Sequence, residues 1–128
     1  MCLARAPHVD RPGADASLSG FVPDGTQEQM RWFSELTRVT TTPEIAVRLR
    51  STAAAIDITA LAPLVRAPTL VLHGVGDAAV PFEQGRRLAA LIPGARFVSL
   101  ESRNHVLLED ERAWPKFLEE VREFLAET

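Results

Sequence analysis

The sequence predicts an α/β fold in which two parallel strands are flanked by helices. Residues 69–73 and 95–100 are short apolar runs next to proline or glycine, and an amphipathic segment at 83–91 separates them. Continuous apolar runs are typical of strands that are covered on both faces, as in parallel sheets. The order strand, helix, strand favours parallel pairing through a right-handed crossover.

Composition indicates a folded domain without affinity for nucleic acid. The chain has 128 residues, of which 46% are hydrophobic and 24% charged, close to the average of globular proteins. Its net charge of −3 offers no clustered basic face for phosphates. Acidic residues outnumber basic ones over residues 101–128, and we interpret them as the solvated face of a terminal helix.

Three segments are predicted along the chain. Residues 1–20 contain several prolines and glycines without any periodicity, so we expect a loose N-terminal tail. Residues 21–60 form the second segment, in which we expect two helices. Residues 61–128 form the third, with both strands, the helix between them and a C-terminal helix.

Helix-start signals define the two helices of the second segment. Thr26 is followed three positions later by Gln29, which makes a capping box. A second helix is predicted to begin after Thr42, with Pro43 at its first position, and to run to about Ala55. The first helix has an apolar face with Met30, Phe33, Leu36 and Val39.

The C-terminal helix is predicted from apolar residues that recur at helical spacing. We expect this set to face inward: Trp114, Phe117, Leu118, Val121 and Leu125.

The sequence gives no sign of a disulfide, a metal centre, a cofactor or a membrane span. Cys2 is the only cysteine, which excludes an internal disulfide and favours a reducing, cytoplasmic location. The three histidines, His8, His73 and His105, are far apart, and no metal-binding spacing occurs. No apolar stretch approaches the length of a signal-peptide core or of a membrane span.

Asp77 and His105 are the candidate catalytic residues. Asp77 follows the first predicted strand and His105 follows the second. Because the carboxyl ends of parallel strands meet at one edge of a sheet, we expect the two side chains to lie within about 2.6–3.2 Å of each other. An acid and a histidine in this chain order are the last two members of a Ser-Asp-His triad. For Asp77, a simple turn residue is the alternative.

The pattern from Pro68 to Gly74, then Asp77 and Val80-Pro81, followed by a strand, His105 and an amphipathic helix, resembles the C-terminal half of an α/β-hydrolase. Residues 21–58 resemble the helical cap that precedes this half in many members. The resemblance implies a partial α/β-hydrolase fold with a cap remnant. It implies that Asp77 orients the histidine and that His105 acts as the base. It does not separate bacterial stand-alone hydrolases from hydrolase modules of multidomain regulators or cyclases.

Two features depart from that family pattern. No Gly-x-Ser-x-Gly nucleophile turn occurs in the 128 residues, so we expect a truncated chain that is inactive by itself. Asn104 stands directly before the histidine, where many members have glycine, and we expect it to tolerate left-handed backbone angles there. Ser99 and Ser102 are the nearest serines to His105, and neither occupies a strand-to-helix turn. His73 is interpreted as a structural or pocket-wall histidine.

Two functional hypotheses remain open. The chain is either part of an ester-type or acyl hydrolase, with a small-molecule ester as substrate once a nucleophile half completes it, or a hydrolase-derived binding or assembly module without catalysis. In both cases an apolar strand at the edge of a small sheet is a template for pairing with another chain. We therefore expect that the isolated chain dimerises through that strand, aggregates, or requires a partner that carries the missing half.

Overall fold

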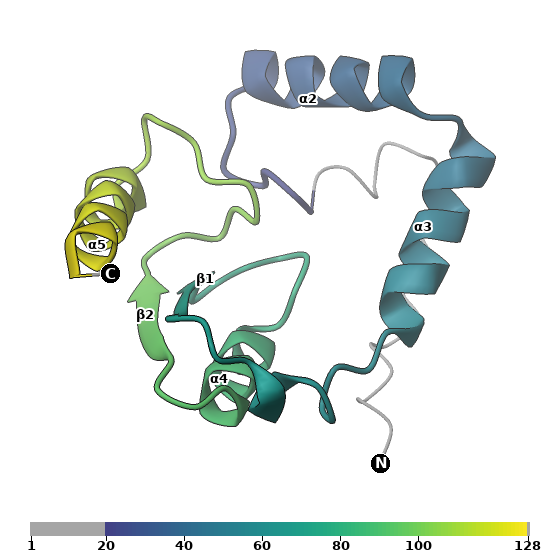
Figure 1. Ribbon diagram of the computed structural model, residues 1–128. Coiled ribbons are helices and arrows are strands. Elements are labelled where there is room, and N and C mark those ends of the chain that lie inside the picture. Colours follow the sequence, from purple (N-terminus) through teal and green to yellow (C-terminus); the bar gives the residue numbers. More distant parts are fainter. Residues whose placement is uncertain (1–19, 128) are drawn as a thin grey trace.

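Two parallel strands and their covering helices form the centre of the fold (Figure 1). The structure is a computed structural model and describes residues 20–127. The expected tail over residues 1–20 lies outside the described residues except for Gly20, as do Cys2 and His8. The elements follow in this order: α2 Gln27–Thr40, α3 Pro43–Ala55, the 3₁₀ helix η1 Ala62–Leu64, β1 Leu70–Gly74, α4 Phe82–Leu91, β2 Arg96–Leu100 and α5 Ala113–Glu127.

The strands pair in parallel, as the sequence predicts. Leu70 lies opposite Arg96 and Gly74 lies opposite Leu100, so both carboxyl ends finish at the same edge of the sheet. Helix α4 makes the crossover between them. The loops that leave the two strands therefore begin side by side.

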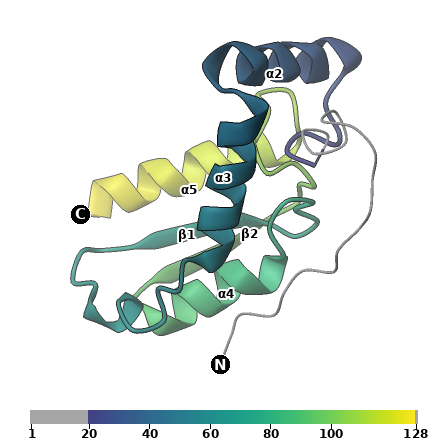
Figure 2. The ribbon, with the colours of Figure 1, turned by 90° about the vertical axis from the view of Figure 1, so that its right-hand side faces the viewer.

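Helices α4 and α5 cover opposite faces of the sheet (Figure 2). Residues alternate between the faces of a strand, and β2 shows this directly. The Phe97 ring packs edge-on against Phe82 of α4, with centroids 5.6 Å apart. Its neighbour Arg96 donates a hydrogen bond from Nη2 to the Glu120 carbonyl of α5 at 3.1 Å. The predicted two-sided cover of the strands is thus present.

The core between these layers is small. Among the described residues, the buried hydrophobic ones are Val22, Ala62, Val71, Ile92, Leu100 and Ala113. The predicted inward face of α5 was wrong for Leu125, a residue that is 66% exposed. The adjacent Phe124 is partly buried instead. Among the described residues, no helix has the length and apolar character needed to cross a membrane.

The predicted starts of α2 and α3 are confirmed. Thr26 Oγ1 accepts the Gln29 amide, and the Gln29 side chain accepts the Thr26 amide, so both halves of the capping box form. Thr42 caps α3, with Pro43 at its first position. These signals are local, which is why the sequence alone was sufficient to find them.

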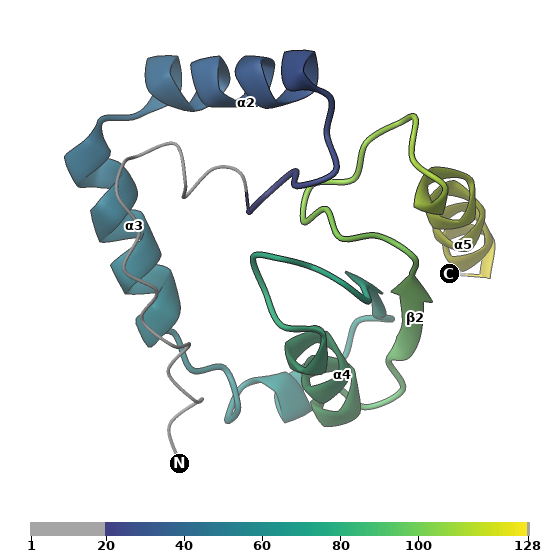
Figure 3. The ribbon, with the colours of Figure 1, turned by 180° about the vertical axis from the view of Figure 1, so that it is seen from behind.

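Helices α2 and α3 form an arm that stands away from the sheet (Figures 1 and 3). Within the described residues neither helix packs against another helix or strand, and neither holds a buried residue. The apolar face expected on α2 is only partly covered, since Val39 is 64% exposed. The arm is attached to the rest of the molecule at its two ends.

Candidate active site

Asp77 lies in the tight turn that follows β1. Its Oδ1 atom accepts the amide protons of Ala79 and Val80, each at 2.8 Å. Aspartate commonly stabilises turns by bonding backbone amides two residues ahead. Both turn bonds use Oδ1, so the second carboxylate oxygen of Asp77 remains free for another partner.

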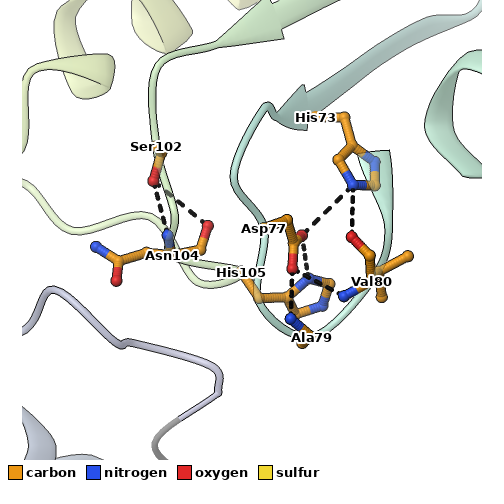
Figure 4. Close-up of polar contacts among 7 residues, drawn as sticks. All are labelled: His73, Asp77, Ala79, Val80, Ser102, Asn104 and His105. Carbon is orange, nitrogen blue, oxygen red and sulfur yellow. Dashed lines mark hydrogen bonds and ion pairs between the residues drawn. The ribbon is translucent and has the colours of Figure 1, made fainter. Parts of the chain in front are cut away.

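That partner is His105, which follows β2. Its Nδ1 atom lies 2.8 Å from Oδ2 of Asp77 (Figure 4). The expected contact between the two side chains is therefore present. The Asp77 side chain is only 5% exposed, whereas that of His105 is 36% exposed. The carboxylate is thus enclosed and the imidazole stands at the surface.

The electrostatics of the pair define the tautomer of the histidine. Burial opposes ionisation of Asp77, but hydrogen bonds from His105, Val80 and Ala79 outweigh it and lower the pKa of Asp77 below its ordinary value. An ionised carboxylate only accepts hydrogen bonds, so Nδ1 of His105 must carry the proton. The other ring nitrogen, Nε2, is then a proton acceptor when the ring is neutral. Within residues 20–127 no group hydrogen-bonds to it.

His73 is the second histidine near the acid. Its Nε2 atom lies 3.1 Å from the Val80 carbonyl oxygen and 3.6 Å from Oδ2 of Asp77. The ring packs edge-on against Phe82, and a Cβ atom at Gly85 would overlap it. His73 therefore stabilises the turn that holds the acid, in agreement with the structural interpretation.

Neither of the two serines nearest to His105 in the sequence, Ser99 and Ser102, hydrogen-bonds to its ring. Ser99 is exposed in β2. Ser102 is buried, and its hydroxyl donates to the Glu111 carboxylate at 2.5 Å. A hydroxyl committed to a carboxylate cannot serve the imidazole at the same time.

Asn104 does not adopt the left-handed backbone angles that its residue type tolerates. Among the described residues, no residue other than glycine has a positive φ. Asn104 is instead 3% exposed, and its Oδ1 atom accepts the Asp24 amide at 2.9 Å. It ties the histidine loop to the N-terminal segment through its side chain. Glu111 is partly buried, which corrects its interpretation as part of a solvated acidic face.

A hollow of about 630 Å³ lies next to the histidine loop. Its walls include Asp24, Gly76, Ser102 and Glu111, but neither Asp77 nor His105. This hollow is therefore separate from the acid–histidine pair. Over residues 20–127 no three His, Cys, Asp or Glu side chains are grouped so that they could hold a metal ion.

One protein-family model matches the chain. The model described as TAP-like protein, of the α/β hydrolases, matches residues 44–127 and so spans both strands, Asp77 and His105. No curated protein and no solved structure matches the chain significantly. Since the match covers more than half of the sequence, the chain belongs to the TAP-like family of α/β hydrolases.

Proposed function

We propose that Asp77 and His105 are the acid and base of an ester-type or acyl hydrolase. The observation that carries this proposal is the 2.8 Å contact between Nδ1 of His105 and Oδ2 of Asp77. Backbone amides fix the acid through its other oxygen. This arrangement fixes the tautomer that a general base needs, with Nε2 free to accept a proton.

In the proposed reaction, Nε2 takes the proton of a nucleophilic hydroxyl as its oxygen bonds to the carbonyl carbon of a small ester. Asp77 stabilises the resulting imidazolium. The proton then passes to the leaving group as the ester C–O bond breaks. Water, deprotonated by Nε2 in the same way, then attacks the acyl carbon and releases the acid, and the proton returns to the nucleophile's oxygen. The 128 residues contain no Gly-x-Ser-x-Gly turn. We therefore infer that the nucleophile comes from another segment, and that the chain is inactive by itself in the cytoplasm.

Hydrolysis of p-nitrophenyl acetate and butyrate by the purified chain tests the inference of inactivity. We expect no saturable turnover beyond the slow background of free imidazole. Turnover that disappears on Ser99→Ala or Ser102→Ala would show that the chain carries its own nucleophile. An upstream Gly-x-Ser-x-Gly segment in the genomic reading frame would support the missing nucleophile half.

A second candidate is a hydrolase-derived binding or assembly module, within a multidomain regulator or alone. The exposed apolar side chains of α3 favour it, since Val47 and Leu49 are 64% and 61% exposed. The two candidate functions predict different effects of changing His105. Replacing it with alanine abolishes hydrolysis in a complex with a nucleophile-bearing half, but leaves assembly unchanged if the role is only structural.

A further inference from the structure

One carboxylate closes the histidine loop, residues 102–108, into a ring. Oε2 of Glu111 accepts the Ser102 hydroxyl at 2.5 Å, and Oε1 accepts the Leu108 amide at 2.6 Å. Ser102 begins the loop, Leu108 ends it, and His105 lies midway between them. A single side chain therefore holds both ends of the segment that presents the imidazole.

The Ser102 hydroxyl carries this restraint to the residue before His105. Its 2.5 Å separation from Glu111 is typical of a strong O–H bond to an ionised carboxylate. The hydroxyl has one proton, so its 3.4 Å approach to the Asn104 carbonyl is at best a minor second contact. Its oxygen also accepts the Asn104 amide at 3.0 Å. Ser102 and Asn104 are both buried, so water does not compete easily for these bonds.

The N-terminal segment holds the same loop from the other side. The Asn104 side chain accepts the Asp24 amide, and the Phe21 carbonyl accepts the amides of His105 and Val106 at 2.8 and 3.0 Å. His105 is thus fixed between two restraints. One comes from Glu111 just before α5, and the other comes from the segment just before α2.

A role of Glu111 in helix α5 alone does not explain this geometry. The backbone carbonyl of Glu111 already accepts the Trp114 amide at the start of α5. Its side chain turns away from that helix and bonds the loop at both ends. Glu111 does not touch the imidazole or Asp77, so any effect on the ring acts through Ser102, Asn104 and Leu108.

We propose that Glu111 is a positioning residue that holds His105 in register with Asp77. The proposal rests on the proposed function of the Asp77–His105 pair. Without the carboxylate, the loop ends separate, the buried Ser102 hydroxyl loses its acceptor, and the imidazole no longer stays at hydrogen-bond distance from Asp77.

The tautomer of the His105 ring tests this proposal. We suggest two-bond ¹H–¹⁵N correlation spectra of the full chain with ¹⁵N-labelled histidine at pH 8.5, where imidazoles are ordinarily neutral. In the wild type, His105 should show the Nδ1–H tautomer that the Asp77 contact requires. In Glu111→Ala, the Nδ1–H tautomer of His105 should lose most of its excess, so that the ring becomes a mixture of the Nδ1–H and Nε2–H tautomers. In Glu111→Gln, whose amide oxygen still accepts one bond, the tautomer should largely return.

The matched control is Glu109→Ala, which removes the same charge from an exposed position two residues away. It should leave the His105 signals unchanged. If Glu111→Ala does not fold, Ser102→Ala makes the smaller change and should also weaken the Nδ1–H signal. A Glu111→Ala or Ser102→Ala protein that is folded by circular dichroism and keeps the wild-type tautomer overturns the positioning role. A wild type without the Nδ1–H tautomer instead contradicts the proposed function itself.

Discussion

Phe21 meets His105 through both its backbone and its ring. The Phe21 carbonyl accepts the His105 amide at 2.8 Å, and the two rings lie edge-on with centroids 5.4 Å apart. On its other side the Phe21 ring lies 5.8 Å from that of Phe33 in α2. The Phe21 ring therefore lies between the imidazole that contacts Asp77 and helix α2.

Replacing Phe21 with alanine should loosen the histidine loop. The ring contacts with His105 and Phe33 are lost, although the backbone carbonyl at position 21 remains. Since Phe21 is only partly buried, we expect a loss of about 1–2 kcal/mol, less than for a core phenylalanine. Native-state hydrogen exchange should show faster exchange of the His105 and Val106 amides, which bond to that carbonyl.

Trp32→Ala is the aromatic control for this change. Trp32 is 64% exposed on α2, so its removal should leave those two amides unchanged. Equal acceleration by both variants would mean that the α2 arm as a whole, rather than the Phe21 ring, stabilises the loop.

Asp77→Asn should lower stability in a pH-dependent way. The native pKa of Asp77 is lowered by its hydrogen bonds against the effect of burial, so the native state favours the ionised carboxylate. This contribution is complete above the ordinary aspartate pKa of about 3.9. It is lost as pH falls through the lower native value. At pH 7 the variant should be less stable by about 1–3 kcal/mol, the cost of a compromised buried hydrogen-bond network.

Urea unfolding of both proteins between pH 7 and pH 3 measures the effect. The difference in unfolding free energy between wild type and variant should be constant at neutral pH. It should shrink below about pH 4, because a protonated Asp77 resembles asparagine. A difference that grows as the pH falls from about 4 to 3, the range in which the carboxylate itself is protonated, would have the wrong sign and would contradict an ionised Asp77.

Gly85→Ala should destabilise the protein although alanine favours helices. In an exposed helix interior this change gains about 1 kcal/mol. At Gly85 of α4 the new Cβ would overlap the His73 ring, and overpacking costs about 1–3 kcal/mol. We therefore expect a net loss in thermal unfolding, accompanied by displacement of His73 from the Val80 carbonyl.

Two further variants isolate the cause. Ala90→Gly lies on the exposed side of the same helix and measures the propensity difference alone. In a His73→Ala background, Gly85→Ala should become neutral or stabilising, because the ring that it would overlap is absent. A Gly85→Ala variant that gains the stability expected from helix propensity alone would show that α4 moves to make room for the new Cβ without loss of stability.

Local sequence patterns made much of the fold predictable. The N-terminal signals of α2 and α3, which are the capping box at Thr26 and the Thr42-Pro43 pair, each lie within four consecutive residues. The two apolar runs gave the parallel strands, whose shared edge implies that Asp77 and His105 meet. These predictions need only the geometry of a single element or of one strand pair.

The features that the sequence did not predict depend mostly on contacts between distant segments. The side-chain oxygen of Asn104 accepts the backbone amide of Asp24, eighty residues earlier in the chain, and no local pattern reports such a partner. Glu111 stands just before α5, where an acid is favourable beside a helix N-terminus. That signal locates the residue but does not reveal the Ser102 hydroxyl that it binds. Leu125 and Phe124 are adjacent on α5, and helical periodicity did not decide which one the sheet covers.

Over residues 20–127, strand β1 has one unpaired edge. Thr69 and Val75, at its two ends, form backbone hydrogen bonds with residues of β2. Because backbone groups alternate between the two sides of a strand, the amides of Leu70 and Leu72 point to the other edge. Within the described residues the sheet has only these two strands, so that edge presents free donors and acceptors.

We expect the purified chain to self-associate through this edge, because unpaired strands template pairing with other chains. Light scattering after size exclusion should give a mass above 14.0 kDa that rises with concentration. Leu70→Pro removes an outward amide at the first position of the strand, where proline is tolerated, and should shift the chain toward the monomer. Leu70→Ala loses the same side chain but keeps the amide, and should still associate.

A wild-type monomer with a cooperative thermal transition would show that the chain folds alone without using the β1 edge. Equal association of both Leu70 variants would place the contact elsewhere, with the exposed apolar side chains of α3 as the next surface to change.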